Sequence, residues 1–514
     1  MSTNASTPPS SNSPSANEYE LVRRSHRDQL KALGVDPYGQ RTAGITPLAT
    51  ARATYKPEMG HDGGPRVTVA GRIVLKRDIG KLSFYTLRDD TGDLQVGLQK
   101  NKLTEPEWAV LKLLDSADII VVRGNLGVTN KGEITVWAEP APDSPSLEIA
   151  SKALLQPPEK YHGLTDVELR YRERYVDLFA NPEVLRMMQL RIRIVDEIRS
   201  YLRGKGYLEV ETPMLQVLHG GANARPFTTH HNALDLKLFL RIAPELYLKR
   251  LLVGGFTKVF EINRNFRNEG ISPRHNPEFT MLEAYEAFGN WETMADMVEE
   301  MVTTVAQNIF GTLKIEHKNA AGEVTRSINL TRPWRRVAMT DLVEERTGWR
   351  FDGRPITDAA PDVLDRLQAA GARAEKVAEH SPHEQLVEVY EKLIEPTLID
   401  PTYVTHVPSI IIPLAKESKT RPGFAEVYEL ACNGVEISPG YTELNDPDVQ
   451  EAQFRRQVGD LAEQQQIDQD FLNALKHGMP PAGGMGMGVD RLVMMLTGAE
   501  SIRDVILFPL MRPH

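Results

Sequence analysis

The sequence of 514 residues contains a single cysteine, Cys432. One thiol cannot form an intrachain disulfide framework, a cysteine-rich zinc site or a cysteine-ligated iron–sulfur cluster. Chains without disulfides are typical of reducing compartments. We therefore expect a cytoplasmic protein.

Long apolar runs are also missing. No stretch approaches the roughly 20 apolar residues that a transmembrane helix requires. Residues 1–16 lack the charged and apolar regions of a signal peptide. Because residues 1–17 are rich in Ser, Asn, Pro and Thr, we expect them to form a disordered tail. The sequence predicts a soluble protein with no membrane partner.

Positive charge is not in excess, since 60 Lys and Arg residues face 70 Asp and Glu residues and give a net charge of -10. Such a surface as a whole repels a polyanion, so any RNA partner would have to meet a local basic or stacking site. The chain also lacks a Walker A motif and a complete dinucleotide-binding glycine motif. A nucleotide such as ATP would need another architecture.

The length predicts two to four domains, preceded by an N-terminal helical extension over residues 18–65. Residues 18–33 are predicted to form a short helix with one basic face. This face could approach RNA, although a solvated face is the simpler interpretation. Its basic residues are Arg23, Arg24, His26, Arg27 and Lys31.

Residues 66–150 have the element order of an OB-fold β-barrel. A strand from residue 66 is followed by strands over 82–89 and 93–98, a helix over 104–114, and strands over 118–125 and 133–137. Thr104 and Glu107 form a capping box at the start of this helix. A helix between the third and fourth strands is typical of the OB-fold, which binds single-stranded nucleic acids or oligosaccharides.

Residues 151–514 are predicted to form a second, larger α+β domain, which follows a Pro- and Ser-rich linker. A long helix begins at Asn181, with Pro182 in its first turn, and a strand over 207–214 ends at Pro213. Mixed helical segments at about residues 335–400 are typical of an insertion.

Two segments of this domain combine polar and aromatic residues on one predicted strand face. In residues 258–269, Arg267 and Glu269 share the polar parity. In the returning strand, Phe279, Glu283 and Tyr285 lie on one side. An arginine beside carboxylates and aromatic rings is suited to bind an anion and an amino group together. A solvated amphipathic hairpin is the alternative interpretation.

Asn433-Gly434 is a strong hairpin signal. A two-residue turn there pairs Ala431 with Glu436 and places Glu429 diagonally across from Glu436, roughly 7 to 8 Å away. Two such carboxylates repel each other unless a cation lies between them, and Mg²⁺ prefers oxygen ligands of this kind. An exposed acidic pair is the alternative.

Near the C terminus, four glycines between residues 483 and 488 precede a predicted amphipathic helix that has Arg491 in its first turn. Glycine lets a backbone approach a ligand closely. An arginine at the positive end of a helix favours phosphate.

These segments together resemble the three signature motifs of class II aminoacyl-tRNA synthetases. The longer strings resemble the bacterial-type class II lysyl-tRNA synthetases, and the resemblance extends from about Arg66 to the C terminus. The strings that carry it are GGANARPF from Gly220, RIAPELYLKRL from Arg241, FEINRNFRNEGIS from Phe260, RHNPEFTMLEAY from Arg274 and GMGVDR from Gly486. The resemblance implies an OB-fold barrel joined to an antiparallel-sheet catalytic domain with a helical insertion.

The resemblance also implies an ATP site. Arg267 and Arg491 would be the catalytic residues that bind phosphates, with Phe279 stacked on adenine against Arg491. Glu269 and His275 would hold the nucleotide, and Glu429 would bind it through Mg²⁺. Up to three Mg²⁺ ions per subunit are implied, with Glu429 and Glu436 as protein ligands.

For the amino acid, the family implies a pocket that holds L-lysine. Arg267 would bind the carboxylate, and Gly221 and Glu245 the α-ammonium group. A cationic side chain in a pocket needs carboxylate and hydroxyl partners. The residues around it would be Glu283, Tyr285, Tyr441 and Glu443. Many members have Asn where this chain has Pro439, which offers no side-chain donor for the carboxylate.

The implied activity is ATP-dependent activation of L-lysine followed by transfer to the 3′ end of tRNA(Lys), in a homodimer. The anticodon would contact Arg77, Phe84, Gln95 and Glu133 of the barrel. If Phe84 has outward parity it could stack a base, and packing inside the barrel is the alternative. Two other functions stay open: a lysine ligase with a protein acceptor, which usually lacks the barrel, and a catalytically silent RNA-binding paralogue, which should have lost some of the phosphate and metal residues.

Overall fold

The computed structural model describes residues 16–142, 144–158, 164, 166–222, 224–460 and 467–512. The tail predicted for residues 1–17 therefore lies almost wholly outside the described residues. The chain forms two compact units, residues 1–185 and 186–514. No helix within the described ranges is long and apolar enough to cross a membrane.

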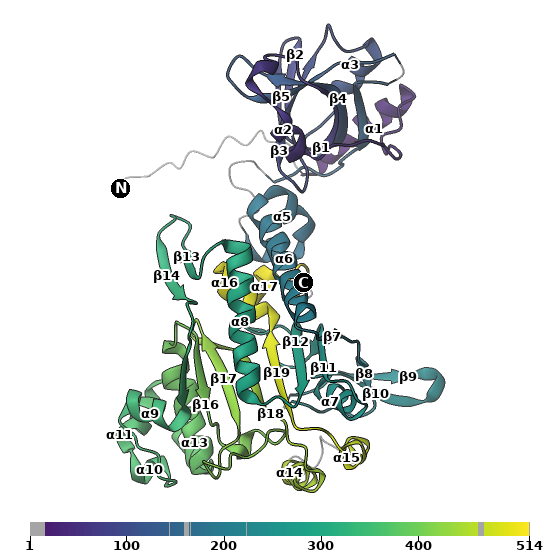
Figure 1. Ribbon diagram of the computed structural model, residues 1–514. Coiled ribbons are helices and arrows are strands. Elements are labelled where there is room, and N and C mark those ends of the chain that lie inside the picture. Colours follow the sequence, from purple (N-terminus) through teal and green to yellow (C-terminus); the bar gives the residue numbers. More distant parts are fainter. Residues whose placement is uncertain are drawn as a thin grey trace, which may run out of the picture. The chain divides into compact units, whose positions relative to one another are not determined.

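The first unit is a closed β-barrel in which strands follow the order β1-β2-β3-β5-β4-β6, and a further β1–β4 pairing closes it (Figure 1). Its elements are α1 (Ala16–Ala32), α2 (Leu48–Thr54), η1 (Pro57–Met59), β1 (Arg66–Ile79), β2 (Leu82–Arg88), β3 (Asp93–Gln99), α3 (Glu105–Leu111), β4 (Ile119–Val128), β5 (Ile134–Ala138), β6 (Leu147–Ser151), α4 (Val167–Arg172) and α5 (Arg174–Ala180). The predicted order of three strands, a helix and two strands is confirmed. Strand β6 was not predicted.

Burial in β2 alternates strictly, with Ser83, Tyr85 and Leu87 inside the barrel and Phe84 on the outer side. The weaker alternation of β1 has a structural cause. This strand pairs with β4 in its first half and β2 in its second half, and the register shifts between Ile73 and Leu75. A bulge of this kind moves the following side chains to the other face.

Helix α1 packs on the barrel, so the predicted basic face is solvated only in part. Arg23 is only 6% exposed and donates to the Ser116 carbonyl at 2.8 Å. His26 Nδ1 lies 2.9 Å from an Asp115 carboxylate oxygen. The side chains of Arg24 and Arg27 pair with carboxylates of α1 itself.

The second unit is built on an eight-stranded sheet with the order β15-β16-β17-β18-β19-β12-β11-β7, antiparallel except for the end pairs β7–β11 and β15–β16. The strands of this sheet are β7 (Leu208–Glu209), β11 (Lys258–Phe266), β12 (Glu278–Ala287), β15 (Arg335–Ala338), β16 (Thr402–Thr405), β17 (Val427–Cys432), β18 (Val435–Thr442) and β19 (Ala482–Gly488). The smaller hairpins use β8 (Leu215–Gln216), β9 (Thr228–His231), β10 (Leu236–Leu240), β13 (Lys314–Lys318) and β14 (Val324–Asn329).

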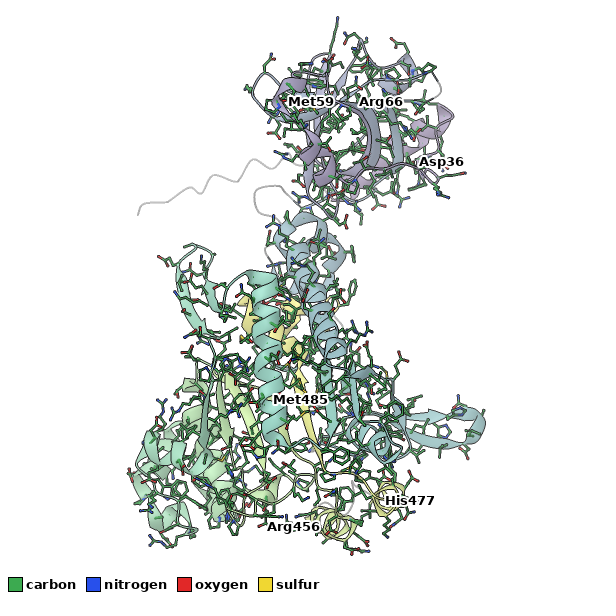
Figure 2. The ribbon with its side chains drawn as sticks, viewed as in Figure 1. Asp36, Met59, Arg66, Arg456, His477 and Met485 are labelled. Atoms are coloured by element: carbon green, nitrogen blue, oxygen red, sulfur yellow. The ribbon has the colours of Figure 1, made fainter. Side chains whose placement is uncertain are left out.

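Helices α6 (Pro182–Gly204), α8 (Trp291–Phe310) and α16 (Val489–Thr497) cover one face of this sheet (Figure 1). Their apolar residues form one core with the strands, and Met485 of the central strand β19 lies in it (Figure 2). In β12 the side chains of Leu282 and Ala284 point into this core. Glu283 and Tyr285 therefore project from the opposite face, which leaves that face free to carry polar side chains.

A helical segment lies between β15 and β16 and has its own apolar core. It contains α9 (Met339–Thr347), α10 (Ile356–Ala359), α11 (Pro361–Ala369), α12 (Ala374–Glu379), α13 (Pro382–Val389), η3 (Tyr390–Ile394) and η4 (Glu395–Thr397). The remaining helices are η2 (Asn232–Leu234), α7 (Glu245–Val253), η5 (Ser409–Ile411), α14 (Pro447–Asp460), α15 (Gln469–Lys476) and α17 (Ile502–Val505).

Three local predictions differ from the structure. The strand predicted over 207–214 shrinks to β7, because the pairing with β11 ends at Glu209 and the chain next pairs with β10, at Leu215 and Gln216. Strand β11 ends at Phe266, so Arg267 and Glu269 lie beyond it and strand parity does not place them. The glycine-rich segment that precedes α16 is the strand β19 in the middle of the sheet.

Candidate active site

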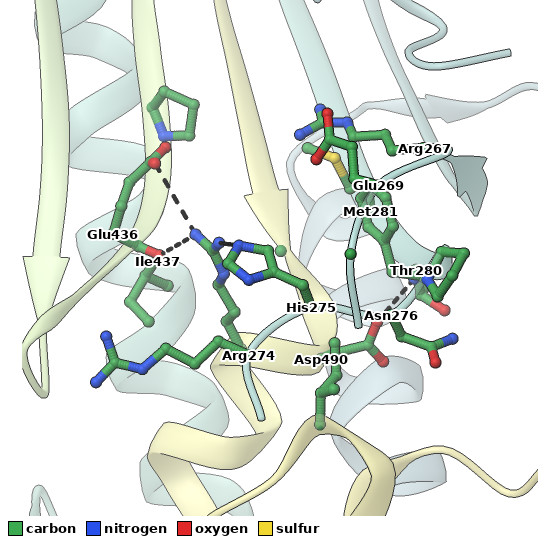
Figure 3. A pocket seen from close by; sticks show the side chains of 17 residues that line it. Arg267, Glu269, Arg274, His275, Asn276, Thr280, Met281, Glu436, Ile437 and Asp490 are labelled. Atoms are coloured by element: carbon green, nitrogen blue, oxygen red, sulfur yellow. Dashed lines mark hydrogen bonds and ion pairs between the residues drawn. The ribbon is translucent and has the colours of Figure 1, made fainter. Parts of the chain in front are cut away.

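A cavity of about 210 Å³ lies beside the carboxyl end of β11, bounded by β12, β18 and the start of α16. Figure 3 shows Arg267 and Glu269 on one side of it and Glu436 on the other, with His275 between them. Five of the six predicted ATP-binding residues line this cavity, and so does Glu436, which was predicted as a Mg²⁺ ligand. The five are Arg267, Glu269, His275, Phe279 and Arg491. Glu429 does not line it.

Arg267 is held by the loop that joins β11 to β12. Its backbone N–H donates to the Pro277 carbonyl at 2.9 Å, and its guanidinium carbon lies 5.1 Å from the centroid of the Phe279 ring. Burial lowers the pKa of Arg267, while the charges of Glu269 and Glu436 act against this shift. Among the described residues, no hydrogen-bond partner meets its buried Nε. The side chain is thus a cation that is ready to bind an anion.

Arg491 approaches from the start of α16. Its Nη1 donates to the Glu436 carbonyl at 2.9 Å, and its Nη2 lies 3.3 Å from His275 Nε2. Burial and the charge of Arg491 lower the pKa of His275, so His275 is a neutral ring at pH 7. Asp490 accepts a hydrogen bond from the Thr280 backbone N–H at 2.8 Å and ties the helix start to β12.

The turn at Asn433-Gly434 joins β17 to β18, and the predicted pairing of Ala431 with Glu436 is confirmed. The register shifts just beyond, so Pro439 lies opposite Glu429. Burial and the charge of Glu436 raise the pKa of Glu429 well above its usual range.

The sequence analysis missed two further carboxylates at this hairpin, Glu391 and Glu395. They come from η3 and η4, at the end of the helical segment. Burial and the charge of Glu436 raise the pKa of both, although a backbone hydrogen bond acts against this shift at Glu395. That bond runs from the Glu436 N–H to Glu395 at 2.7 Å. No short motif links them to Glu436, because β16 and β17 lie between them and Glu436 in the sequence.

A second polar cluster projects from the same sheet face, and its residues do not line the cavity. Glu245, Glu283 and Glu443 are at most 5% exposed. The Tyr285 hydroxyl donates to Glu283 at 3.0 Å, and the Tyr441 hydroxyl donates to Glu245 at 3.0 Å. The structure thus brings together the five predicted side chains of this cluster.

Electrostatics in this cluster are unbalanced. Burial raises the pKa of Glu283 to about 8, and the charge of Glu245 adds to the shift. Burial also raises the pKa of Glu443, against the effect of Lys249. Within the described ranges, Glu443 Oε1 meets no hydrogen-bond donor. A buried carboxylate with a free oxygen is suited to receive a cationic group.

Two glycines shape the space around these groups. A Cβ atom at Gly484 would lie 1.9 Å from Glu443 Oε1 and 2.5 Å from Tyr285 Cε1. Gly221 has a φ of +83°, and a Cβ there would lie 3.1 Å from the Glu245 Cβ. Glycine is required at Gly484 because the side chains of Glu443 and Tyr285 lie against its backbone.

Comparisons with known proteins agree with this arrangement. Residues 166–512 match the family described as class II tRNA synthetases (D, K and N), and residues 67–140 match the OB-fold nucleic acid binding domain. The lysine–tRNA ligase of Carboxydothermus hydrogenoformans is 47% identical, covering 97% of this chain and 99% of the relative. Those of Pelotomaculum thermopropionicum and Thermosynechococcus vestitus are each 46% identical, covering 97% of this chain and 96% and 97% of the relatives.

The chain belongs to the lysine–tRNA ligase family of class II synthetases. The resemblance seen in the sequence is confirmed, as is the fold class, an OB-fold barrel with an α+β synthetase domain. The comparisons give no support to a protein-acceptor ligase or to a silent paralogue.

The barrel of this lysine–tRNA ligase family member presents the predicted anticodon residues on its outer side. Arg77 pairs with Phe84 across β1 and β2, and Thr86 pairs with Gln95 across β2 and β3. Gln95 donates to the Thr135 hydroxyl at 2.8 Å. Phe84 has the predicted outward parity, and Glu133 is exposed in the residue before β5.

Two aromatic residues of the barrel escaped the sequence analysis. The Trp137 ring lies 5.7 Å from the Phe84 ring, edge to face, and stacks on His61 at 4.3 Å. A Cβ atom at Gly97 would lie 2.5 Å from the Trp137 ring. Phe84 therefore rests on an aromatic support and still lies on the outer side.

Proposed function

We propose that this chain joins L-lysine to tRNA(Lys) in two steps. A lysine carboxylate oxygen attacks the α-phosphorus of ATP, forming lysyl-adenylate and releasing pyrophosphate. The 3′-terminal ribose hydroxyl of the tRNA then attacks the acyl carbon, and AMP leaves. The observation that carries the proposal is the buried acidic cluster of Glu245, Glu283 and Glu443 on the sheet face that also holds the arginine-lined cavity.

Arg267 is proposed to bind both reacting groups, the lysine carboxylate and the α-phosphate. Positioning the two together removes much of the entropy cost of the reaction, and the guanidinium stabilises the charge that develops on the phosphate. Arg491 would bind the other phosphates. Phe279 is proposed to stack on adenine, with Glu269 and His275 holding the nucleotide.

Glu429 and Glu436 are proposed to hold Mg²⁺ together with ATP. The donor set fits this ion, because Mg²⁺ is usually bound by one or two carboxylates plus substrate phosphates. Among the described residues, no group of three or more His, Cys, Asp or Glu side chains is arranged to hold a metal alone. When bound, the ion would neutralise phosphate charge.

The amino-acid side of the proposal assigns each charge of lysine a partner. Gly221 and Glu245 would take the α-ammonium group, and Glu283, Tyr285 and Glu443 the ε-ammonium group. The Tyr441 ring would cover the aliphatic stem. At Pro439 the chain lacks a side-chain donor, so Arg267 would hold the carboxylate.

Two assays test the function. Purified protein is mixed with ATP, radiolabelled pyrophosphate and each of the 20 amino acids, and then with tRNA and labelled amino acid. We expect the rates of exchange and of charging with lysine to exceed those with any other amino acid by at least about 100-fold. Charging of a protein acceptor, or no lysine-dependent exchange, would contradict the proposal.

Replacing Gly484 by alanine is expected to reduce lysine-dependent exchange by about 100-fold or more. The new Cβ would fall on Glu443 Oε1 and the Tyr285 ring, and a displacement of about 1 Å at a reacting group can cost this much. Steady-state exchange kinetics measure the loss. Gly204→Ala is the matched control, since a Cβ there meets nothing within 4 Å. Near-normal exchange in Gly484→Ala would exclude lysine from this pocket.

Replacing Phe84 by alanine is expected to weaken tRNA charging by about tenfold and to leave lysine-dependent exchange unchanged. Stacking of a base on an aromatic ring contributes about 1 to 3 kcal/mol, and only the tRNA step uses the barrel. The measurement compares the KM for tRNA with the exchange rate. If both fall together, Phe84 supports folding instead of anticodon binding.

We further propose a homodimer in the cytoplasm. Four apolar side chains near the start of the second unit are about half exposed: Ile192, Leu208, Leu215 and Val217. Light scattering of the purified chain tests this, and a monomeric mass at micromolar concentration would contradict it.

A further inference from the structure

The acidic cluster contains a cation that the chain itself supplies. Lys249 lies one helical turn after Glu245 on α7 and is 0% exposed. Its Nζ donates to Glu245 Oε1 at 2.7 Å and to the Leu414 carbonyl at 3.3 Å, and it forms an ion pair with Glu443. It therefore joins the carboxylate proposed for the α-ammonium group to the one proposed for the ε-ammonium group.

A count of charges shows what this cation does. The two ammonium groups of bound lysine favour ionised carboxylates, against the burial that raises the pKa of Glu283 and Glu443. With lysine bound, Glu245, Glu283 and Glu443 then carry three negative charges and Lys249 carries one positive charge, so the net charge of these four residues is -2. Lysine brings two ammonium groups, and its carboxylate is assigned to Arg267. The pocket and the two ammonium groups are then neutral together, which a buried site requires.

The other titratable groups beside the pocket do not change its net charge. Glu261 is also buried, but Arg241 pairs with it at 2.7 Å. Burial and the nearby carboxylates raise the pKa of Tyr285 and Tyr441 well above their usual range. Both phenols stay neutral, and each donates a hydrogen bond to a carboxylate.

We propose that Lys249 is a positioning residue that holds Glu245 and Glu443 in place and sets the net charge of the pocket to -2, which matches an amino acid with two ammonium groups. The proposal rests on the proposed function, since it concerns the same pocket. In this proposal, Lys249 contacts neither ATP nor the reacting carboxylate of the substrate. Its contribution is to the recognition of the substrate side chain.

The protonation state of the pocket depends on this ammonium group. Burial alone would lower the pKa of Lys249, but the charges of Glu245 and Glu443 outweigh burial and the net shift is upward. Lys249 thus stays charged. Without the Lys249 ammonium group, no cation would compensate the negative charges of Glu245 and Glu443, which would repel each other and Glu283. Buried carboxylates in this situation take up a proton, since like charges raise the pKa, and a protonated carboxyl binds ammonium poorly.

Lys249→Met tests this with the full-length protein and ATP/pyrophosphate exchange. We expect kcat/KM for lysine to fall by at least about tenfold at pH 7.0. The gap to the wild type should narrow toward pH 9.0, because the carboxylates ionise as the pH rises while the substrate ε-ammonium group, with an ordinary pKa of about 10.4, stays charged. The KM for ATP should stay unchanged.

Lys258→Met is the matched control. Lys258 also pairs with a glutamate, Glu286 at 2.8 Å, but lies outside the pocket. Its loss should change kcat/KM for lysine by less than about threefold at every pH.

The outcomes separate the two proposals. Wild-type protein without lysine-dependent exchange would contradict the proposed function. Wild-type activity with an unaffected Lys249→Met variant, or with a loss that is equal at all pH values, would overturn the role of Lys249. Should Lys249→Met fail to fold, Lys249→Arg keeps the charge and changes its position. It should raise the KM for lysine while keeping the wild-type pH profile, and a wild-type KM there would overturn the positioning role.

Discussion

Replacing Arg267 by alanine should reduce lysine-dependent exchange of pyrophosphate into ATP by about 1,000-fold or more. The guanidinium is the cation that the β11–β12 loop holds over Phe279, with a buried Nε that meets no partner among the described residues. Removal of a single donor to a developing negative charge costs about 100- to 1,000-fold. Arg267 is expected to serve both the carboxylate and the α-phosphate, so its loss should lie at the upper end. Initial exchange rates at saturating lysine and ATP measure the effect.

Two further variants make this result specific. Arg264→Ala removes an arginine of β11 that lies three residues earlier and does not line the ATP cavity. The ion pair of Arg264 with Glu278 is long, at 3.7 Å. We expect the Arg264→Ala variant to retain exchange within about threefold. Arg267→Lys keeps a charge but loses the planar fork and should recover only part of the activity. Near-normal exchange in Arg267→Ala would show that activation occurs elsewhere.

Much of the fold could be predicted because local signals and tertiary structure agree. Tyr85 and Leu87 follow the period of two that a half-buried strand requires, and they point into the barrel. Asn433 and Gly434 adopt positive φ angles at the turn between β17 and β18, as the hairpin signal requires.

The strand β19 could not be predicted in this way, because glycine weakens strands and four of its seven residues are glycine. These glycines are required by contacts with other parts of the fold. The side chains of Glu443 and Tyr285 approach the backbone at Gly484, and the Asn290 backbone approaches it at Gly483. Only the folded sheet shows that these neighbours exclude a Cβ atom.

The residues of the candidate site likewise fall into those that a local pattern predicts and those that only the fold places. Glu283 and Tyr285 share a face because β12 is regular, so their parity was predictable. Arg267 lies past the end of β11, so strand parity could not predict its position, and only the family motif indicated its role. Glu245 and Lys249 are four residues apart on a helix, a spacing that is typical of a surface ion pair. The pair is buried because the sheet and Leu414 close over it, and the sequence gives no local sign of that.

Replacing Glu443 by glutamine should raise the KM for lysine by about 100-fold or more, with little change in the KM for ATP. Glu443 is 0% exposed and its Oε1 has no donor within the described part of the chain. An amide of nearly the same shape keeps the packing but leaves a buried ammonium group without its counter-charge. Breaking a buried charge pair from one side costs about 3 to 5 kcal/mol, which corresponds to more than 100-fold. Lys249 would keep Glu245 as its partner at 2.7 Å, so the helix should stay in place.

The matched control for this variant is Glu300→Gln. It removes a surface ion pair with Lys205 at 2.7 Å and should change the KM for lysine by no more than about twofold, because exposed ion pairs contribute little. Lysine titrations of the exchange rate give both KM values. An unchanged KM in Glu443→Gln would place the ε-ammonium group elsewhere, with Glu283 as the remaining carboxylate on that side of the pocket. A loss of kcat with an unchanged KM would instead link Glu443 to the reacting atoms.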